Sequence, residues 1–440
     1  MTLIDLIPPV ARNRHLGALP VAIIGAGPVG LSAAAHLHER GIRFVIYEAG
    51  DAIASSIAVW GHTRLFSPWR HLVDPAAKRL LRENGWEAPD GDAIPTGTEL
   101  IADYLAPLGA LEAIGSHVRL ATKVTAVSRE GMDRTRTAGR ASRPFVLRLA
   151  TPGGVVDATA AAVIDASGTY LTPNSLGSNG LDPLGFERVA DLVSHSLPDV
   201  LGTERERFAG RHAVVVGAGH SAANTLVNLA RLAREEPGTA VTWVIRNAAA
   251  VRVLGSGDDE LQARASIGTA VRRLVGSGAI SQVDGFEIVG LERDTTSHGN
   301  GVSIIGNRGA VLERIHADVI VNATGFRPDL GMLREIRLSL DEIVEAPAAL
   351  APLIDPNQHS CATVPPHGIV ELAQPERDFF IAGMKSYGRA PTFLLATGYE
   401  QVRSIADELA GDADAARRVQ LILPATGVCS TSVEDGPSCC

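Results

Sequence analysis

The chain has 440 residues and a net charge of −9, and 45% of its residues are hydrophobic while 20% are charged. That length and balance exclude a disordered chain and suffice for two or three globular domains with substantial cores. Acidic charge without a long basic run gives no indication of a nucleic-acid partner. Residues 1–19 lack the order of a signal peptide, and the apolar run 21–37 is short and holds a glycine turn, so no membrane segment is expected.

Cysteine usage bears on the cellular compartment. The chain has four cysteines, and three of them fall within its last twelve residues. A disulfide framework is therefore implausible, and we expect a reduced, cytoplasmic protein.

The first predicted unit is a dinucleotide-binding motif. An apolar run at 21–24 leads into Gly-Ala-Gly-Pro-Val-Gly at 25–30 and then into an alanine-rich helix. The first glycine permits the turn, the second lets the backbone approach a pyrophosphate, and the third lets the helix pack closely on its strand. The helix N-terminus then offers unpaired N–H groups and a positive dipole end to the phosphates. The candidate cofactor contacts in this motif are Gly25, Gly27, Pro28 and Gly30.

The nucleotide of this first site is indicated by the next strand. That strand, at 44–47, ends at Glu48. A carboxylate there accepts hydrogen bonds from ribose hydroxyls and repels a 2′-phosphate, so the site suits FAD or NAD, and we assign it to FAD.

A second motif of the same kind follows. An apolar run at 213–216 leads into Gly-Ala-Gly-His-Ser-Ala at 217–222, and the strand at 241–245 ends at Arg246 without an acidic residue. A guanidinium suits a 2′-phosphate, so this site is predicted to bind NADPH. Each motif alone could be a structural strand-to-helix connection, but two in register predict two dinucleotides and electron transfer between them. The candidate contacts are Gly217, Gly219, His220, Ser221, Ala222 and Arg246.

These motifs predict an α/β fold with two Rossmann-like dinucleotide-binding domains, the second inserted in the first. The expected divisions are an FAD-binding domain at 1–175, an NADPH-binding domain at 176–325, a return segment of the FAD domain at 326–425, and a flexible cysteine-containing tail at 426–440.

Six local elements complete this prediction. Two of them are strands, near 118–127 and at 145–149. Residues 98–113 are expected to be helical, and 131–144, rich in Arg, Thr and Ser, to form an exposed hairpin loop. In the return segment, a strand at 379–383 precedes a helix from about Pro391 to Gly411. We expect the N-terminus of this helix to face the flavin pyrimidine carbonyl and stabilise negative charge, the alternative being a surface helix with a proline start.

At this point the chain resembles the two-dinucleotide-domain flavoproteins, and within them the class B flavin monooxygenases. The matching parts are the two glycine motifs, Glu48, and Ala-Thr-Gly-x-x-x-Asp at 323–329. A narrower likeness is to flavoprotein monooxygenases associated with arsenic resistance. It is carried by Pro-Asn-Gln-His-Ser-Cys at 356–361, Met-Lys-Ser-Tyr-Gly-Arg-Ala-Pro-Thr at 384–392, and Gly-Tyr-Glu-Gln-Val-Arg-Ser at 398–404.

The resemblance implies further site residues. It suggests Lys385, Arg389 and Thr392 as flavin contacts, and it places Arg64 and Trp69 where the isoalloxazine packs, although Trp69 could equally be a core residue. Cys361, Lys385 and Arg389 are the candidate catalytic residues. Further candidate cofactor contacts are Val124, Gly168, Thr324, Gly325, Gly383 and Pro391.

Three departures from these families affect the prediction. The class B motif F-x-G-x-x-x-H is missing before the second fingerprint, where the nearest sequence is Val-Ser-His-Ser at 193–196. Phe66 stands where class B enzymes place an asparagine beside the flavin, which puts oxygen activation in doubt. The Gly-Asp pair of thioredoxin reductases is replaced by Gly383 and Met384.

The electron acceptor is constrained by the cysteines. Disulfide reductases need a Cys-x-x-Cys or Cys-x4-Cys pair beside the flavin, and this chain has neither. Oxygen, a quinone or a metal species remains as the acceptor.

The cysteines suggest a thiophilic ligand. Cys429, Cys439 and Cys440 are candidate metalloid thiols, because trivalent arsenic takes three sulfur ligands and mercuric reductases use a vicinal pair near a C-terminus. The alternative is a disordered tail with incidental cysteines. Cys361 could be a small packed residue, and His359 and His367 are interpreted as loop histidines without metal-ligand spacing.

Three hypotheses follow. The first is an FAD-dependent, NADPH-consuming monooxygenase acting on a soft nucleophile such as a trivalent arsenical. The second is a flavin reductase that passes electrons to a thiol-bound metal or a quinone without oxygenation. The third is a metalloid-binding or redox-sensing flavoprotein. The expected partners are a small-molecule substrate and molecular oxygen, with no nucleic acid and no membrane, and a homodimer is left open.

Overall fold

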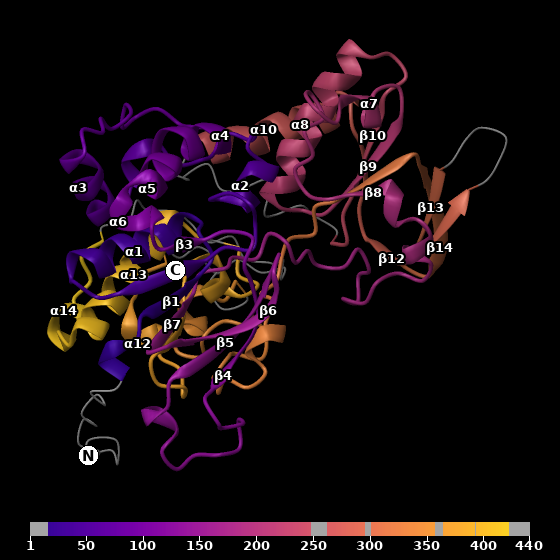
Figure 1. Cartoon of the computed structure of the whole chain (residues 1–440). Helices are drawn as coiled ribbons and strands as arrows, with labels where there is room; N and C mark the ends of the chain where they lie inside the picture. The colour runs from indigo at the N-terminus through magenta and orange to yellow at the C-terminus, as the bar shows by residue number, and fades with distance from the viewer. Residues whose placement is uncertain (1–15, 248–261, 295–300, 357–363, 392, 422–440) are drawn as a thin grey trace, which may run out of the picture.

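The computed structural model describes residues 16–247, 262–294, 301–356, 364–391 and 393–421. Figure 1 shows two lobes side by side, one built from the two ends of the chain and the other from its middle. Each lobe has a parallel sheet covered by helices, which is the arrangement that buries both faces of a parallel sheet. The predicted α/β fold is confirmed.

The first lobe is organised by a five-stranded parallel sheet in the order β16-β7-β1-β2-β3. Its three central strands are fully or almost fully buried, as their continuous apolar sequences require. The strands are β1 (Val21–Ile24), β2 (Phe44–Tyr47), β3 (Val118–Arg119), β7 (Ala162–Asp165) and β16 (Phe379–Ile381).

The second lobe has a parallel sheet in the order β11-β10-β9-β15-β8. All its strands fall between β7 and β16 in the sequence, so this sheet is inserted into the chain of the first. The strands are β8 (Val193–Ser194), β9 (His212–Val216), β10 (Ala240–Val244), β11 (Ser281–Val283) and β15 (Val319–Asn322).

Each lobe also carries a three-stranded antiparallel sheet, in the orders β4-β5-β6 and β12-β13-β14. The sequence prediction included β4 and β5 but missed the others, because strands that are half exposed carry a weak hydrophobic pattern. The strands are β4 (Lys123–Arg129), β5 (Phe145–Thr151), β6 (Gly154–Ala160), β12 (Phe286–Asp294), β13 (Gly301–Arg308) and β14 (Val311–Ala317).

Helices cover both parallel sheets. In the first lobe α1 packs against α13 and α3, and in the second α8 packs against α10 (Figure 1). Their bounds are α1 (Pro28–Glu39), α2 (Ser55–Val59), α3 (Pro75–Glu83), α7 (Arg205–Phe208), α8 (His220–Glu235), α10 (Gln262–Gly276), α11 (Ala351–Ile354), α12 (Ile369–Leu372), α13 (Leu395–Ala410) and α14 (Ala413–Arg417).

The predicted helix at 98–113 is broken into shorter pieces. A π-helical turn at Ile101–Leu105 precedes Pro107, which has no N–H to donate, and Leu111 is extended, with φ −62° and ψ 135°. The pieces are α4 (Gly97–Leu100), η4 (Ile101–Leu105), α5 (Ala106–Ala110) and α6 (Glu112–Gly115).

The helix of the return segment starts later than predicted. It begins at Leu395 rather than Pro391, because Leu394 is extended with φ −115° and ψ 143°. Its end agrees with the prediction, since Gly411 adopts the left-handed conformation of a helix C-cap, with φ 90°.

The predicted exposed loop at 131–144 is mainly exposed, and one of its residues is fully buried. Arg140 is buried, and its guanidinium pairs with Glu376 at 2.8 Å. Arg129 on β4 pairs with the same carboxylate at 2.9 Å and lies 3.5 Å from the centroid of the Phe145 ring. These two ion pairs connect the antiparallel sheet to the segment before β16.

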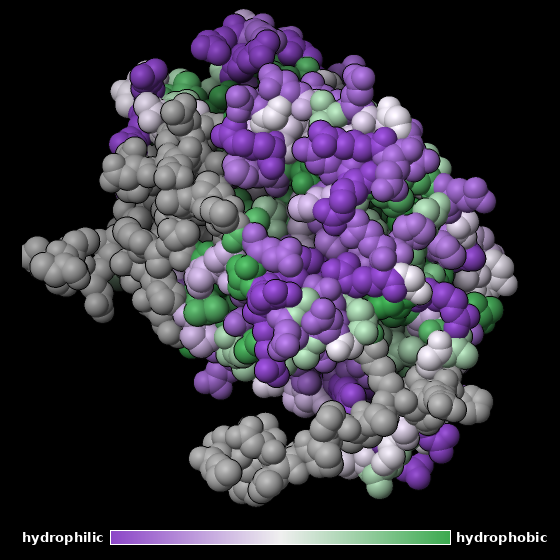
Figure 2. All heavy atoms as spheres, turned by 90° about the vertical axis from the view of Figure 1, so that its left-hand side faces the viewer, coloured by the Kyte–Doolittle hydropathy of each residue, from purple (hydrophilic) through white to green (hydrophobic). Residues whose placement is uncertain are grey.

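The surface of the first lobe is mainly hydrophilic on the face seen in Figure 2, with apolar side chains in small groups. Among the described residues, no helix combines the length and the apolar character that a membrane span requires.

Candidate nucleotide and flavin site

The first glycine motif forms a tight turn at the carboxyl end of β1. Gly25 has φ 99°, and a Cβ atom there would lie 2.9 Å from the carbonyl oxygen of Ala166. A Cβ on Gly30 would lie 2.0 Å from the carbonyl oxygen of Gly25, so only glycine allows α1 this close to the turn. A Cβ on Gly27, the N-cap of α1, would meet nothing within 4 Å. The chain thus leaves space in front of a helix N-terminus where a pyrophosphate fits.

Glu48 lies directly beside this turn. Its Oε2 accepts a hydrogen bond from the backbone N–H of Ala26 at 2.7 Å, and its Oε1 accepts bonds from Gly50 N and Ser55 Oγ, both at 2.8 Å. A carboxylate offers about four acceptor positions, so capacity remains for a ribose hydroxyl. The structure therefore brings the predicted acid and the predicted glycine turn together.

Residues 54–66, which follow the first glycine motif in the sequence, connect the two lobes. The N–H of Ala54 donates to the carbonyl of Ala26 at 3.1 Å, which anchors the start of α2 on the glycine turn. Further along, the Phe66 ring meets the His220 ring edge to face, with centroids 5.3 Å apart. His220 is the first residue of α8, so one short segment contacts both fingerprints.

Arg64 and Trp69 lie in or next to this segment in different settings. Arg64 is exposed and donates to the carbonyl oxygen of Ile94. Trp69 is buried within the main core of the first lobe. Their proposed contacts with the isoalloxazine stay predictions.

The second glycine motif repeats the first in the other lobe. Gly217 has φ 131°, and a Cβ there would lie 2.1 Å from the carbonyl oxygen of Ala323 at the end of β15. A Cβ on Gly219, the N-cap of α8, would meet nothing within 4 Å. Ala222 takes the place of the third glycine and is fully buried, and Ser221 lies between it and His220 at the start of α8.

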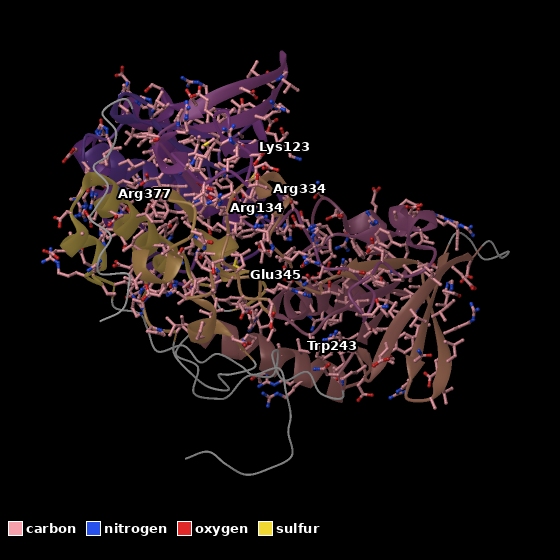
Figure 3. All side chains as sticks on the ribbon, turned by 90° about the horizontal axis from the view of Figure 1, so that it is seen from below. Lys123, Arg134, Trp243, Arg334, Glu345 and Arg377 are labelled. Atoms are coloured by element: carbon pink, nitrogen blue, oxygen red, sulfur yellow. The ribbon has the colours of Figure 1, made fainter. Side chains whose placement is uncertain are left out.

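The predicted 2′-phosphate residue lies at the same edge of this sheet. Trp243, buried in β10 and labelled in Figure 3, donates from Nε1 to the carbonyl of Gly217 at 2.7 Å. Arg246 follows that strand, is exposed, and donates from Nη1 to the carbonyl of Ser178 at 3.0 Å. The guanidinium is therefore hydrogen-bonded at one nitrogen and exposed, and a guanidinium has further N–H donors to offer a phosphate.

Thr324 and Gly325 belong to a two-stranded connection between the lobes. Thr324 Oγ1 donates to the carbonyl of Asn174 at 3.1 Å, and Asn174 N donates to the carbonyl of Gly325 at 2.9 Å. Nearby, the rings of Tyr170, His195 and Phe326 pack on one another with centroids 4.6 to 5.7 Å apart. Burial raises the pKa of Tyr170 to about 12, so its hydroxyl is neutral at pH 7.

The return segment closes the first lobe against the fingerprint. A Cβ on Gly383, which has φ 69°, would lie 3.1 Å from the Val29 side chain of α1. A Cβ on Gly398 of α13 would lie 2.7 Å from the same Val29 atom. Both α13 and the turn after β16 therefore press directly on the start of α1.

Lys385 is the most deeply buried of the predicted charged residues. Its Nζ lies 2.7 Å from Oδ2 of Asp165, and both side chains are 0% exposed. Lys385 also donates to Ser167 Oγ at 3.1 Å. This ammonium belongs to an ion pair at the carboxyl end of β7, next to the first fingerprint.

The remaining predicted residues are spread around this region. Arg389 and Pro391 are exposed. Val124, on β4, is buried in a hydrophobic core, and Gly168 adopts φ 73° after β7. Other predictions fall outside the described residues, namely those for Cys361, Thr392, Cys429, Cys439 and Cys440.

Sequence reasoning missed the polar partners in this region, among them Asp165 and Gln401. Asp165 ends a strand predicted from its apolar sequence, and a carboxylate at the carboxyl end of a buried parallel strand is the signal that could have identified it. Gln401 lies inside α13 and has no such positional signal.

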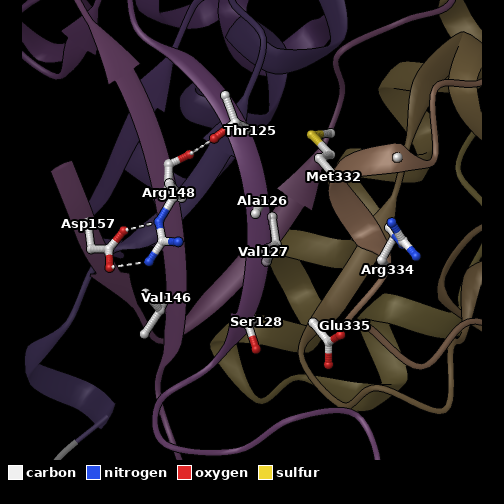
Figure 4. Close-up of a pocket in the computed structure, with 11 residues that line it drawn as sticks. Thr125, Ala126, Val127, Ser128, Val146, Arg148, Asp157, Met332, Arg334 and Glu335 are labelled. Carbon is white, nitrogen blue, oxygen red and sulfur yellow. Dashed lines mark hydrogen bonds and ion pairs between the residues drawn. The ribbon is translucent and has the colours of Figure 1, made fainter. Parts of the chain in front are cut away.

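A recess of about 460 Å³ lies apart from these residues (Figure 4). It is lined by β4, β5, β6 and the turn at 331–335, and the Arg148 and Asp157 side chains at its rim pair with each other at 2.9 Å. None of its lining residues belongs to the predicted sites.

Comparison with known proteins places these features in context. The family model described as pyridine nucleotide-disulphide oxidoreductase matches residues 22–362. Thiamine thiazole synthase of Pyrobaculum neutrophilum is 35% identical over 176 residues, which are 38% of this chain and 63% of that protein. Flavin-containing monooxygenase FMO GS-OX-like 2 of Arabidopsis thaliana is 27% identical over 255 residues, covering 52% of this chain and 50% of the plant protein. The chain thus matches between half and just under two thirds of each relative.

Among solved structures, the bacillithiol disulfide reductase Bdr from Bacillus cereus is similar. It superposes with a TM-score of 0.66 at 20% identity, covering 89% of this chain and 99% of that one. At this level of identity the likeness concerns the fold.

Proposed function

This chain belongs to the pyridine nucleotide-disulphide oxidoreductase family, and from that premise we propose that it is an FAD-dependent, NADPH-consuming monooxygenase. The observation that carries the proposal is that residues 54–66 contact both glycine motifs. Ala54 is hydrogen-bonded to the first glycine turn, and Phe66 contacts the first residue of the helix that follows the second. Two nucleotide sites joined in this way suit transfer of a hydride from one to the other.

The residues present fit these two groups. Bound FAD supplies the redox chemistry, and the chain would hold its pyrophosphate at Gly27 and the N-terminus of α1 and its ribose at Glu48. NADPH would take the equivalent position at Gly219, with Arg246 on its 2′-phosphate.

The absence of a Cys-x-x-Cys or Cys-x4-Cys motif from the sequence separates this chain from ordinary disulfide reductases. The four cysteines stand at 361, 429, 439 and 440, so no Cys-x-x-Cys or Cys-x4-Cys motif exists to exchange electrons with a disulfide. The partial match to a plant flavin-containing monooxygenase supports oxygen as the acceptor.

For the substrate we propose a soft nucleophile, with a trivalent arsenical as the first candidate. This follows from the sequence resemblance to arsenic-resistance monooxygenases and from the three tail cysteines. In the overall reaction NADPH gives two electrons, one oxygen atom of O₂ is added to the arsenic lone pair, and the other leaves as water with two protons. The arsenic is oxidised from the trivalent to the pentavalent state.

A second candidate is a flavin reductase that delivers electrons to a quinone or a thiol-bound metal. It is favoured by Phe66, whose side chain carries no hydrogen-bond donor at the position where the related monooxygenases have an asparagine. Under this alternative NADPH oxidation proceeds without oxygen.

The test measures NADPH oxidation by the FAD-loaded full chain, with oxygen uptake and peroxide followed together. Arsenite and a monomethyl trivalent arsenical are the probes, and Gly27→Ala gives the background from unbound flavin. Arsenical-dependent oxygen uptake with little peroxide, and incorporation of ¹⁸O from ¹⁸O₂ into the product, supports the monooxygenase. Arsenical-independent peroxide release contradicts the substrate, and equal anaerobic turnover with a quinone supports the reductase instead.

A further inference from the structure

A buried polar network joins three parts of the first lobe next to the first glycine motif. It includes His367, just before α12, Gln401 in the middle of α13, and the η9 turn (Gly383–Tyr387) that follows β16. His367 is 1% exposed, and Gln401 and Ser386 are 0% exposed. Buried polar groups of this kind are costly unless each donor and acceptor is used.

Gln401 closes a ring of hydrogen bonds around the turn. Its Oε1 accepts from the N–H of Gly383 at 2.7 Å, and its Nε2 donates to Ser386 Oγ at 2.9 Å. Ser386 Oγ donates in turn to the carbonyl of Gly383 at 2.7 Å. The ring holds the backbone of Gly383 on both sides, at the residue that packs against Val29 of the first fingerprint.

The Gly383 N–H and His367 together fix the orientation of the Gln401 amide. The ring Nδ1 lies 3.0 Å from the carbonyl of Pro365, which can only accept, so Nδ1 carries the proton. Nε2 is then an acceptor, and the second N–H of the Gln401 amide donates to it at 2.9 Å. Reversing the amide would place its NH₂ group against the N–H of Gly383, so only one orientation satisfies all the groups.

We propose that His367 and Gln401 are positioning residues that set the Gly383–Tyr387 turn against the FAD-binding helix, and that the turn keeps its geometry only while His367 is the neutral Nδ1–H tautomer. This inference depends on the proposed FAD site. A proton on Nε2 of His367 places an N–H donor against the N–H donor of the Gln401 amide. The amide cannot rotate to avoid this without losing the hydrogen bond that it accepts from the N–H of Gly383. Protonation of one buried ring therefore disturbs the residue that contacts Val29.

The surroundings favour the neutral form. Burial lowers the pKa of His367, and it outweighs the Pro365 carbonyl and the carboxylates of Glu371 on α12 and Glu400 on α13, which act in the opposite direction. The Tyr387 ring also faces the imidazole, at 5.6 Å between centroids. It carries no charge at pH 7, since an ordinary tyrosine pKa is about 10 and burial raises the pKa of Tyr387 further. The linked loss of FAD affinity is therefore expected on the acid side of pH 6.5.

The first experiment titrates apo-protein with FAD from pH 7.5 down to the lowest pH at which the apo-protein stays folded, using quenching of flavin fluorescence. One linked proton changes affinity by at most about tenfold per pH unit below the pKa, and we expect a loss approaching that slope in the wild type. His367→Gln keeps an acceptor for Gln401 and takes no proton, so its FAD affinity should stay constant with pH. His38→Asn, at an exposed histidine of α1, is the matched control and should follow the wild type. The proposal would be overturned if FAD affinity depended on pH in the same way in the wild type and in His367→Gln.

A second experiment does not depend on FAD. Histidine Cε1–H resonances of the apo-protein are titrated by NMR, with His367 assigned from the spectrum of His367→Gln. We expect the wild-type His367 to titrate below pH 6.5, and Gln401→Glu, which places a carboxylate oxygen at Nε2, to move that titration to higher pH. An unchanged His367 titration in Gln401→Glu contradicts the network. If the protein fails to bind FAD while this shift occurs, the proposed function fails and the network stands.

Discussion

Nζ of Lys385 lies 2.7 Å from Oδ2 of Asp165, and neither side chain reaches solvent. The two residues are 220 positions apart in the sequence, and they meet because β16 pairs with β7 and the turn after β16 passes over the end of that strand. The ion pair therefore ties the return segment to the strand beside the first fingerprint.

The first prediction concerns this ion pair. Lys385→Met leaves the Asp165 carboxylate buried without its counter-ion and should lower the free energy of unfolding by about 3–5 kcal/mol. The double variant Lys385→Met/Asp165→Asn removes the charge as well and should recover part of that loss. Urea unfolding of the apo-protein measures both, with Lys123→Met, at an exposed lysine labelled in Figure 3, as the control. If Lys385→Met were as stable as the wild type, the ion pair would not be important for stability.

The second prediction separates folding from FAD binding within one glycine motif. Gly30→Ala places a methyl group 2.0 Å from the carbonyl of Gly25, so it should destabilise the apo-protein by about 3 kcal/mol or more. Gly27→Ala meets no protein atom within 4 Å, so it should fold normally while FAD affinity falls by at least about 100-fold. Thermal unfolding and FAD titration of both variants test this. If Gly27→Ala binds FAD as the wild type does, the pyrophosphate does not lie at this turn.

The third prediction is a pH dependence of stability centred on Glu376. Burial raises the pKa of this carboxyl, but the hydrogen bonds and charges of Arg140 and Arg129 outweigh burial, and the net shift is downward. A carboxyl with a depressed folded-state pKa stabilises the protein above its unfolded pKa, about 4.3, and loses that contribution as pH falls through the folded value.

Glu376→Gln should therefore be less stable than the wild type by about 3–5 kcal/mol at pH 7, with the difference shrinking below about pH 4. Urea unfolding at several pH values measures it. Glu87→Gln, at an exposed glutamate far from this network in the sequence, is the control and should stay within about 0.5 kcal/mol of the wild type. A constant difference between Glu376→Gln and the wild type across this pH range would show that the charge of Glu376 is not responsible.

Features encoded by neighbouring residues were predictable from sequence. The fingerprint at 25–30 needs glycine for a local reason, because the turn and the helix packing on it involve residues only a few positions apart. The strands β1, β7 and β9 are short apolar runs in the middle of parallel sheets, and such runs are readable without knowledge of their partners.

Features that depend on distant contacts were not predictable. Arg129 and Glu376 are 247 residues apart, and nothing in either local sequence indicates the other. His367 lies in the loop before α12, as the sequence predicts. Its contacts with Gln401 of α13 and Tyr387 of the η9 turn were not predictable, because they depend on the fold. The late start of α13 at Leu395 has the same origin, since helix boundaries respond to packing as well as to a proline signal.

The last prediction concerns nucleotide choice at the second fingerprint. Arg246 lies just after β10, at the carboxyl edge of the sheet where the Gly217–Ala222 turn stands, and its guanidinium makes one bond to the Ser178 carbonyl while remaining exposed. Arg246→Ala removes charge-assisted hydrogen bonds to a 2′-phosphate, worth about 1.5–3 kcal/mol, so the KM for NADPH should rise about 10- to 100-fold. The KM for NADH, which has no 2′-phosphate, should change little.

Arg211→Ala is the matched control, because Arg211 is exposed in the same lobe but precedes β9 at the opposite edge of the sheet. Steady-state NADPH and NADH oxidation by the three proteins gives the comparison. Equal increases for both nucleotides in Arg246→Ala would mean that this guanidinium supports the lobe rather than the phosphate.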